Sequence, residues 1–576
     1  MKLSITNINF QLRISQMIMF AGVGATLAIS PWSNLDPISL PKLLVLSSFG
    51  FAIFGLLLSV GIRNRLDSAT KVFFIASALF LFWICLVVFV SGAPISQQIW
   101  GMFGRNTGML AYVSLCSLAM GSALLGSARR NRVLIALLLT TIPINLYCFV
   151  QLSGKDPVQW SEFQTFATLG NVNFLSAFLG ITSIALLAIS WDEKRDIKSR
   201  FALILWIIVS LGVVWSTGSI QGIMAFLAGF VALTLLWISK SKKKLVLFSL
   251  LIPVYVFFLV ETILGLVNKG FLRDFIYQPS VVFRGDYMHA GWAMTLRKPF
   301  FGVGMDSYGD WYREVRGEVS TLRTGPDRIA NTAHNVFLDI SSNGGFPLLF
   351  IYLFMLGFAM WCAAKYWISV SKRDYIFMSI LSAWVAFQVQ AAVSINQLGV
   401  GVWGWVLTGL LVSYGRQTID ISNSQQNPAA FTRKKENRKF SDGFTKKNSQ
   451  GYELLPASNL LYVLVFGVIG FIAAWIPLRA DSHFRSASSE RNLQKIEKAV
   501  SELGATAWHY NLAIDSAVTS NLADPAYKLS KELTSKFPRD YYGWRLLAIL
   551  NNSTEQEKGI ARDRMLALDP FNPENK

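Results

Sequence analysis

Long apolar segments separated by short polar ones dominate the first 415 residues of the sequence, and one more apolar segment follows near residue 460. An α-helix needs about 20 apolar residues to cross a bilayer. The segments are continuously apolar instead of alternating, which excludes a membrane β-barrel. The pattern therefore predicts an all-α polytopic membrane protein with about 13 transmembrane helices. The predicted spans are 14–31, 42–62, 72–92, 107–127, 133–152, 171–191, 201–217, 220–238, 245–267, 344–366, 375–396, 398–414 and 457–477.

Composition agrees with this pattern, because 53% of the residues are hydrophobic and only 15% are charged, against about 25% charged in soluble domains. A net charge of +19 would suggest nucleic acid as the partner of a soluble protein. Here the charge sits in loops between spans, so we expect no nucleic-acid partner. The four cysteines all lie in apolar segments and are interpreted as small core residues.

Basic residues concentrate in every second loop, and this alternation predicts the orientation of the chain. With 13 spans and a cytoplasmic N-terminus, all the strongly basic loops are cytoplasmic. The segment 268–334 and the tail from about 478 onwards then lie outside. The basic loops are 63–71, 128–132, 192–200, 240–244, 371–374 and 415–456.

Four regions follow from these patterns. Residues 1–415 form the membrane bundle, 416–456 a disordered basic linker rich in Ser, Asn, Gln and Lys, and 457–477 the last span. Residues 478–576 are polar and Ala-rich, with helical periodicity. Pro538 and Pro570, 32 positions apart, each follow an amphipathic helix, which resembles tetratricopeptide hairpins. An unrelated small helical domain is the alternative. A tetratricopeptide-like domain would offer a groove to a protein partner.

The external segment 268–334 is the largest water-facing insertion among the spans, so chemistry is expected there. It holds nine basic and seven acidic residues, and its arginines suit phosphate binding. His334 is one of only four histidines and opens an apolar run at the membrane boundary. An imidazole can accept a proton at neutral pH. The spacing alone favours an interfacial hydrogen-bonding histidine over a catalytic one. No nucleotide loop, dinucleotide fingerprint or metal-ligand spacing is present in the sequence, so no cofactor or metal is expected.

Several motifs in order resemble the bacterial O-antigen ligase and polymerase superfamily. They are His334–Asn335 with "GGFPLL" (344–349), and upstream of them Arg284, Trp292, Pro299, Gly302 and Gly304. The segments 100–113 and 168–179 resemble the branch that carries tetratricopeptide-like tails. The resemblance covers residues 90–415. One departure is "STGSIQG" (216–222), where the family often has Ser-Arg.

The resemblance implies a metal-independent membrane glycosyltransferase that moves a glycan from undecaprenyl diphosphate to an acceptor hydroxyl at the outer face of the plasma membrane. In such a reaction, Arg284 would stabilise the departing diphosphate and His334 would accept the proton of the hydroxyl. Arg105, Arg328, Asn335 and Trp292 are the candidate substrate-binding residues.

The acceptor stays open at this point. A glycolipid would make the protein a ligase, a second lipid-linked repeat a polymerase, and a protein hydroxyl an O-oligosaccharyltransferase. A transporter of lipid-linked glycans is the alternative from another class. It would be expected to place several acidic groups within its spans or to show paired internal repeats; the sequence shows little sign of such groups and no repeat of the spans. A structural scaffold would leave Arg284 and His334 without a purpose.

Overall fold

Helices make up all the regular structure in the part of the chain that the computed structural model describes, residues 8–60, 66–159, 164–426 and 457–575. All thirteen predicted apolar segments fall on helices. The bundle contains α1 (Ile8–Leu27), α2 (Ser39–Ser59), α3 (Ser68–Val90), α5 (Met109–Ala123), α6 (Ser127–Leu139), α7 (Thr141–Leu152), α8 (Val172–Ser190), α9 (Ile197–Ser216), α10 (Ile220–Ser239), α11 (Lys244–Leu266), α16 (Val336–Ser369), α17 (Tyr375–Ala391), α18 (Leu398–Gln426) and α20 (Ala457–Ser489). The prediction of an all-α membrane protein is confirmed.

Ten helices among the described residues are long and apolar enough to cross a membrane, and α5 and α17 are shorter apolar helices. Thirteen crossings stay a prediction. Polar residues begin many of these helices by accepting hydrogen bonds from otherwise unpaired backbone N–H groups. Such caps are Asp67 for α3, Asn171 for α8, Asp196 for α9, Ser219 for α10, Asn335 for α16 and Asp374 for α17.

Two predicted spans differ in detail from the structure. The segment 133–152 is broken into α6 and α7 just before Pro143, because proline lacks an N–H and clashes with the preceding turn. The span predicted at 344–366 begins eight residues earlier, at Val336, and α16 is kinked at Gly345, where φ is +75°. Its first two turns therefore form a separate short helix above the membrane-spanning part.

Two spans of the bundle, α18 and α11, differ strongly in apolarity and in burial. Every residue of Leu398–Gly415 in α18 is buried, and this is the least apolar of the ten spans. By contrast, no residue in the apolar window of α11 is buried inside the protein. Lipid tails cannot satisfy polar groups, so only helices enclosed by other helices can carry many of them.

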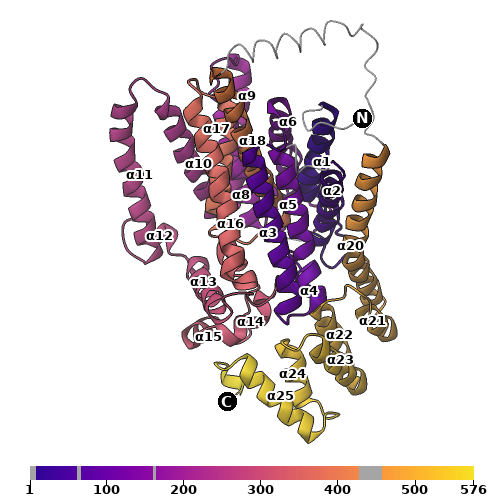
Figure 1. The fold of residues 1–576 in the computed structure, drawn as a ribbon. Helices are drawn as coiled ribbons and strands as arrows, with labels where there is room; N and C mark the ends of the chain where they lie inside the picture. Colours follow the sequence, from indigo (N-terminus) through magenta and orange to yellow (C-terminus); the bar gives the residue numbers. More distant parts are fainter. Residues whose placement is uncertain (1–7, 61–65, 160–163, 427–456, 576) are drawn as a thin grey trace.

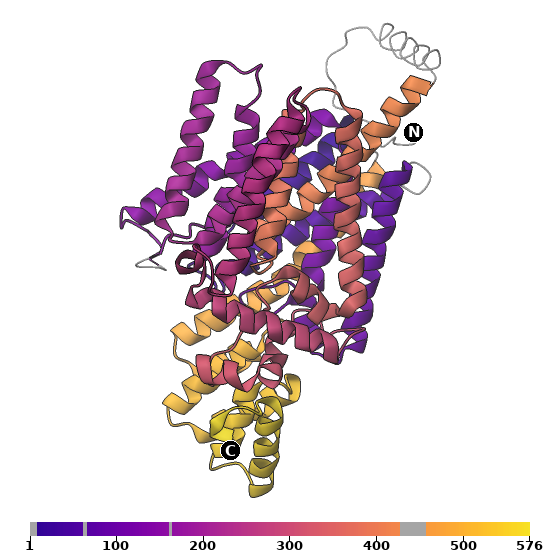
Figure 2. The same cartoon turned by 90° about the vertical axis from the view of Figure 1, so that its left-hand side faces the viewer.

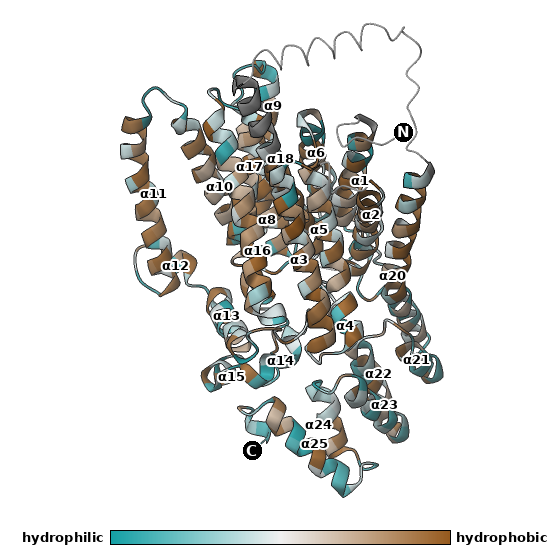
Figure 3. Cartoon of the chain, viewed as in Figure 1, coloured by the Kyte–Doolittle hydropathy of each residue, from teal (hydrophilic) through white to brown (hydrophobic). Residues whose placement is uncertain are grey.

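The polar insertion folds as α12 (Arg273–Ile276), α13 (Pro279–Arg297), α14 (Tyr308–Val315) and α15 (Glu318–Thr324). Figure 1 shows α13, α14 and α15 together at one end of the bundle, beside the short α4 (Ile95–Trp100). Figure 3 shows hydrophilic residues on these elements and on the C-terminal helices, whereas the long helices of the bundle are mainly hydrophobic.

The C-terminal helices lie beyond the same end of the bundle, as Figure 2 also shows. They are α21 (Leu493–Val500), α22 (Ala507–Thr519), α23 (Ala523–Lys536), α24 (Tyr541–Ile549) and α25 (Glu555–Leu568). Consecutive members pack against each other; their assignment as a tetratricopeptide domain stays a prediction. The predicted boundary at 478 falls inside α20, which runs without a break from the bundle into this region. The predicted linker begins within α18, and its residues 427–456 lie outside the described part of the chain.

Candidate active site

Arg284 and His334 are brought together by the packing of α13 against α16. Arg284 lies in the second turn of α13, and His334 immediately precedes the residue that caps α16. Their proximity is evident in the electrostatics, since burial and the positive charges of Arg284 and Arg105 lower the pKa of His334 to about 4. The imidazole is therefore neutral at physiological pH. Its ring faces that of Tyr287, with the centroids 5.2 Å apart.

The guanidinium group of Arg284 is half-buried and has no hydrogen bond or ion pair with any group that the structure describes. Burial also lowers its pKa slightly from the usual value. The guanidinium of Arg328 lies 4.9 Å from the ring of Phe283, the residue before Arg284. Burial raises the pKa of Tyr287, and the nearby charge of Arg328 opposes that rise. Arg284, which has no carboxylate partner among the described residues, thus lies near a neutral imidazole, and Arg328 lies near Phe283 and Tyr287 of the same helix. A free guanidinium of this kind suits an anion.

Arg105 is in a different state from Arg284, because two buried carboxylates surround it. Its Nε lies 3.6 Å from Asp306 and its Nη2 lies 3.7 Å from Asp339. Its Nη1 donates to the backbone oxygen of Asn331 at 2.6 Å. These contacts tie the turn after α4 to the segment that leads into His334. These contacts do not test the prediction that Arg105 binds substrate. They do show that two carboxylates already balance the positive charge of Arg105.

Asp339 holds the backbone around His334. Its Oδ1 accepts from the N–H of Ala333 at 2.8 Å, and its Oδ2 accepts from the hydroxyl of Thr332 at 2.8 Å. The same hydroxyl accepts from the N–H of His334 at 2.9 Å. His334 itself has a φ of +52°, in the left-handed region that non-glycine residues rarely adopt. These contacts keep the histidine in its strained conformation.

Asn335 and Trp292 have contacts of their own. The side-chain oxygen of Asn335 caps α16 by accepting from the N–H groups of Phe337 and Leu338, and its Nδ2 donates to the oxygen of Ala392 at 2.9 Å. Trp292 is 45% exposed and packs edge-on against Phe346, 5.9 Å away, just after the kink in α16. Their substrate-binding roles stay predictions.

The glycine motif in residues 299–304 packs directly on the kink of α16. Val303 N–H donates to Ser342 at 2.8 Å, and Phe346 N–H donates to Pro299 at 2.8 Å. A Cβ atom on Gly302 would lie 2.4 Å from the backbone of Asn343, and one on Gly345 would lie 2.2 Å from Phe300 O. Glycine is thus needed at both positions for the backbones to approach. This contact fixes the N-terminal turns of α16, and with them His334.

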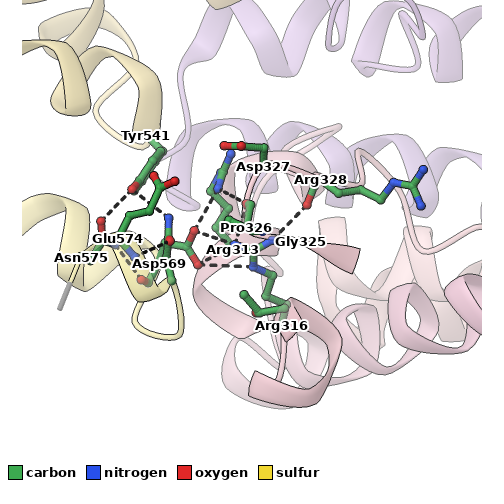
Figure 4. A network of polar contacts seen from close by, with 12 residues as sticks. Arg313, Arg316, Gly325, Pro326, Asp327, Arg328, Tyr541, Asp569, Glu574 and Asn575 are labelled. Atoms are coloured by element: carbon green, nitrogen blue, oxygen red, sulfur yellow. Dashed lines mark hydrogen bonds and ion pairs between the residues drawn. The ribbon is translucent and has the colours of Figure 1, made fainter. Parts of the chain in front are cut away.

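The C-terminal region contributes to the same loop through a buried ion pair (Figure 4). Arg316 and Asp569 are both fully buried, and Arg316 Nη2 lies 2.7 Å from the carboxylate. Arg313 adds a second contact to Asp569 at 2.9 Å. Arg316 also donates to the backbone oxygens of Pro326 and Arg328. Asp569 therefore fixes, through Arg316, the loop that carries Arg328.

Comparison with known families bears on these residues. Residues 203–353 match a family model described as O-Antigen ligase. This match identifies an O-antigen ligase domain within the chain and supports a relationship to the O-antigen ligase and polymerase superfamily. The match begins in α9 and ends in α16, so the O-antigen ligase domain contains Arg284, Arg328 and His334. Arg105 and the C-terminal helices lie outside it. No curated protein matches the chain.

The O-antigen ligase domain has consequences for the function. The protein is a membrane glycan ligase or polymerase of cell-envelope polysaccharide biosynthesis, and therefore an enzyme that joins glycans. Its substrates are a lipid-linked glycan and an acceptor. Sequence reasoning selected Arg284 and His334, but it missed Asp339 and the pairing of Arg105 with Asp306. Asp339 could have been noticed as an acidic residue close to a predicted membrane boundary, whereas Asp306 lies in the middle of the external segment.

Proposed function

We propose that the enzyme transfers a glycan from undecaprenyl diphosphate to an acceptor hydroxyl at the outer face of the plasma membrane. The observation that carries the proposal is the unpaired cation of Arg284 beside the neutral imidazole of His334. A diphosphate that leaves a sugar gains negative charge on its bridging oxygen. A fixed guanidinium stabilises that charge more in the transition state than in the ground state.

The proposed step is a direct displacement. The acceptor oxygen forms a bond to the anomeric carbon while the bond to the diphosphate oxygen breaks, and the diphosphate leaves with the electron pair. The proton of the acceptor passes to His334. This displacement inverts the anomeric centre. Arg284 and Arg328 supply the positive charge, so we propose that transfer needs no metal and continues in EDTA.

A pKa of about 4 makes His334 a weak base in the free enzyme. Part of that lowering comes from the charges of Arg284 and Arg105. A bound diphosphate brings negative charge next to these arginines and offsets their effect. The pKa of His334 then rises when the donor binds, so the base becomes effective with substrate in place.

The basic loops support an external position for this site. Lys240 donates to the backbone oxygens of Trp367 and Val370, and Arg373 lies 3.5 Å from Glu193. The basic loops 192–200, 240–244 and 371–374 therefore meet, at the end of the bundle opposite α13 (Figure 1). Basic loops remain in the cytoplasm, which supports an outer location for α13 and the C-terminal helices.

The experiment is glycan transfer in membranes that contain equal amounts of wild-type and variant protein. Arg284→Ala and His334→Ala should each lower kcat by about 10²–10³-fold. Arg273→Ala is the matched control, because the exposed side chain of this arginine in the same insertion pairs, among the described residues, with its neighbour Asp274 alone. Wild-type turnover in Arg284→Ala or His334→Ala would remove that residue from the mechanism.

A further inference from the structure

A cavity of about 190 Å³ lies where the C-terminal helices meet the membrane domain. Its walls come from the turn after α4, from α14, and from α22 and α24. Ile329 and Asn331 also line it, on the loop that carries Arg328 and His334. The volume far exceeds that of one water, ~30 Å³, but is below the roughly 300–1,000 Å³ of sites that enclose a whole drug-sized ligand. The cavity therefore fits part of a larger molecule.

One wall of the cavity is aromatic. The rings of Phe103 and Trp508 stack with their centroids 5.5 Å apart and their planes at 11°. Trp508 is 50% exposed, so much of its ring is free to take a further contact. A rigid aromatic surface of this kind matches flat apolar faces, such as the C–H face of a sugar ring.

Two hydrogen-bond acceptors of the residues that line the cavity lack partners among the described residues. The side-chain oxygens of Asn106 and Asn511 are buried, and neither receives a hydrogen bond from any group in the described residues. Their amide nitrogens are occupied, since Asn106 donates to the oxygen of Trp100 and Asn511 to Asp540. A buried acceptor without a partner costs about 1–3 kcal/mol. Both oxygens are closed to water in this conformation, so a ligand with several hydroxyl donors would satisfy them once the side chains turn toward the cavity.

The charges in the cavity balance and are already engaged. Arg313 pairs with Asp569, and Arg539 pairs with Glu314 and lies 3.6 Å from the ring of Trp311. The acidic residues of the wall are Asp310 and Asp540. Burial raises the pKa of Asp310 to about 7, which reduces its charge near neutrality. The cavity thus lacks the free cation found at Arg284 and suits an uncharged polyhydroxylated ligand better than a phosphate.

We infer that this cavity is a saccharide subsite, which holds a sugar unit of a glycan whose reacting end lies at Arg284 and His334. The loop 329–334 connects the two places. The inference rests on the proposed function for the position of the reacting end. The sugar can belong to the donor glycan or to a glycan acceptor, because both offer the same hydroxyls and ring faces.

Binding is measured first, independently of turnover. Purified full-length His334→Ala protein is titrated calorimetrically with the delipidated repeat unit released from the cell's lipid-linked glycan. Adding Trp508→Ala, which removes the aromatic wall, or Ala507→Phe, which fills the cavity, should weaken binding about tenfold or more. Trp544→Ala is the matched control, since this tryptophan of the same domain does not line the cavity. Melting temperatures identify any variant that is misfolded.

Steady-state kinetics of Trp508→Ala and Ala507→Phe, with the His334 side chain restored, then show whether the bound sugar belongs to the donor or to the acceptor. A higher KM for the lipid-linked donor alone assigns the cavity to the donor glycan, and a higher KM for a glycan acceptor alone assigns it to the acceptor. Folded Trp508→Ala and Ala507→Phe proteins with unchanged binding and unchanged KM values would overturn the inference. So would calorimetric binding of an acceptor peptide, but not of the glycan, that Trp508→Ala and Ala507→Phe weaken. These results do not depend on whether Arg284→Ala loses turnover, so the two proposals fail separately.

Discussion

Arg105 and Arg284 are both arginines, but they differ in whether a carboxylate neutralises their charge. Arg105 is nearly buried between Asp306 and Asp339, whereas Arg284 has no carboxylate partner among the described residues. Removing one partner of a buried ion pair costs about 3–5 kcal/mol, because the remaining charge is left uncompensated. Arg105→Met should therefore lower the melting temperature clearly, and Arg284→Met should not. Thermal unfolding in detergent measures both, and equal melting temperatures would contradict this distinction.

The ionisation of His334 gives a second prediction at the residue scale. The imidazole cannot act as a base once it is protonated. Because its pKa is about 4 in the free enzyme, protonation occurs only when the pH falls to about that value. We expect kcat/KM to stay level from pH 8 down to about pH 5 and to fall below that. An unperturbed histidine would lose activity near pH 6.5. A fall centred near pH 6.5 would contradict the predicted environment.

The positive charge of Arg284 helps to lower the pKa of His334, so removing that charge should raise this pKa. Arg284→Gln should raise the pKa of His334, and Arg273→Gln should leave it unchanged. The chain has only four histidines, so labelled imidazole nitrogens can be followed individually by NMR.

The selection of Arg284 and His334 was possible from the sequence because both residues border one insertion. The partners of Arg105 were not predictable, since about two hundred positions separate them from it.

Among the elements, α16 combines a membrane span with a short helix that presents His334. Gly345 marks the joint, with φ at +75° and no room for a Cβ atom beside Phe300 O. Gly345→Ala should destabilise the protein by about 1–3 kcal/mol through strain and overpacking, and it should lower kcat by moving His334. Gly357→Ala in the same helix is the control, because a Cβ atom there meets open space. Melting temperature and turnover together test this, and equal values for the two variants would contradict it.

The apolar segments predicted the helices, because a backbone inside lipid must satisfy its hydrogen bonds within each helix. The same argument could not predict the kink in α16. The sequence "GGFP" (344–347) permits a break, but the helix is bent where the backbone of residues 299–304 packs against it. The break between α6 and α7 was detectable from Pro143 alone.

In the whole molecule, the buried pair Arg316–Asp569 connects the C-terminal region to the loop that carries Arg328. Asp569→Asn leaves the fully buried Arg316 without its counter-charge, at a cost of about 3–5 kcal/mol. We expect earlier proteolysis of the C-terminal region and lower turnover, because Arg316 also holds the backbone of Arg328. Glu555→Gln removes an exposed pair with Lys558 and should change neither. Normal turnover and protease resistance in Asp569→Asn would refute the connection.

The orientation of the molecule gives the last prediction. Cysteine introduced for Glu318, exposed in α15, should react with a membrane-impermeant maleimide in intact cells. Ser371→Cys, exposed at the opposite end, should react only after lysis. The native cysteines give a low background, as three are buried and Cys85 lies within the apolar helix α3. The reverse labelling pattern would place the candidate site in the cytoplasm.

The sequence by itself determined the membrane-embedded helical fold and the insertion in which chemistry was to be sought, because burial in lipid imposes a length and an apolarity that can be recognised in any single segment. It also singled out Arg284 and His334. Only the tertiary structure decided which arginine is paired and which has no partner among the described residues. It also decided where α16 bends, and that Asp569 near the C-terminus supports the loop that carries Arg328. Those properties depend on distances between residues far apart in the chain, and no local pattern encodes them.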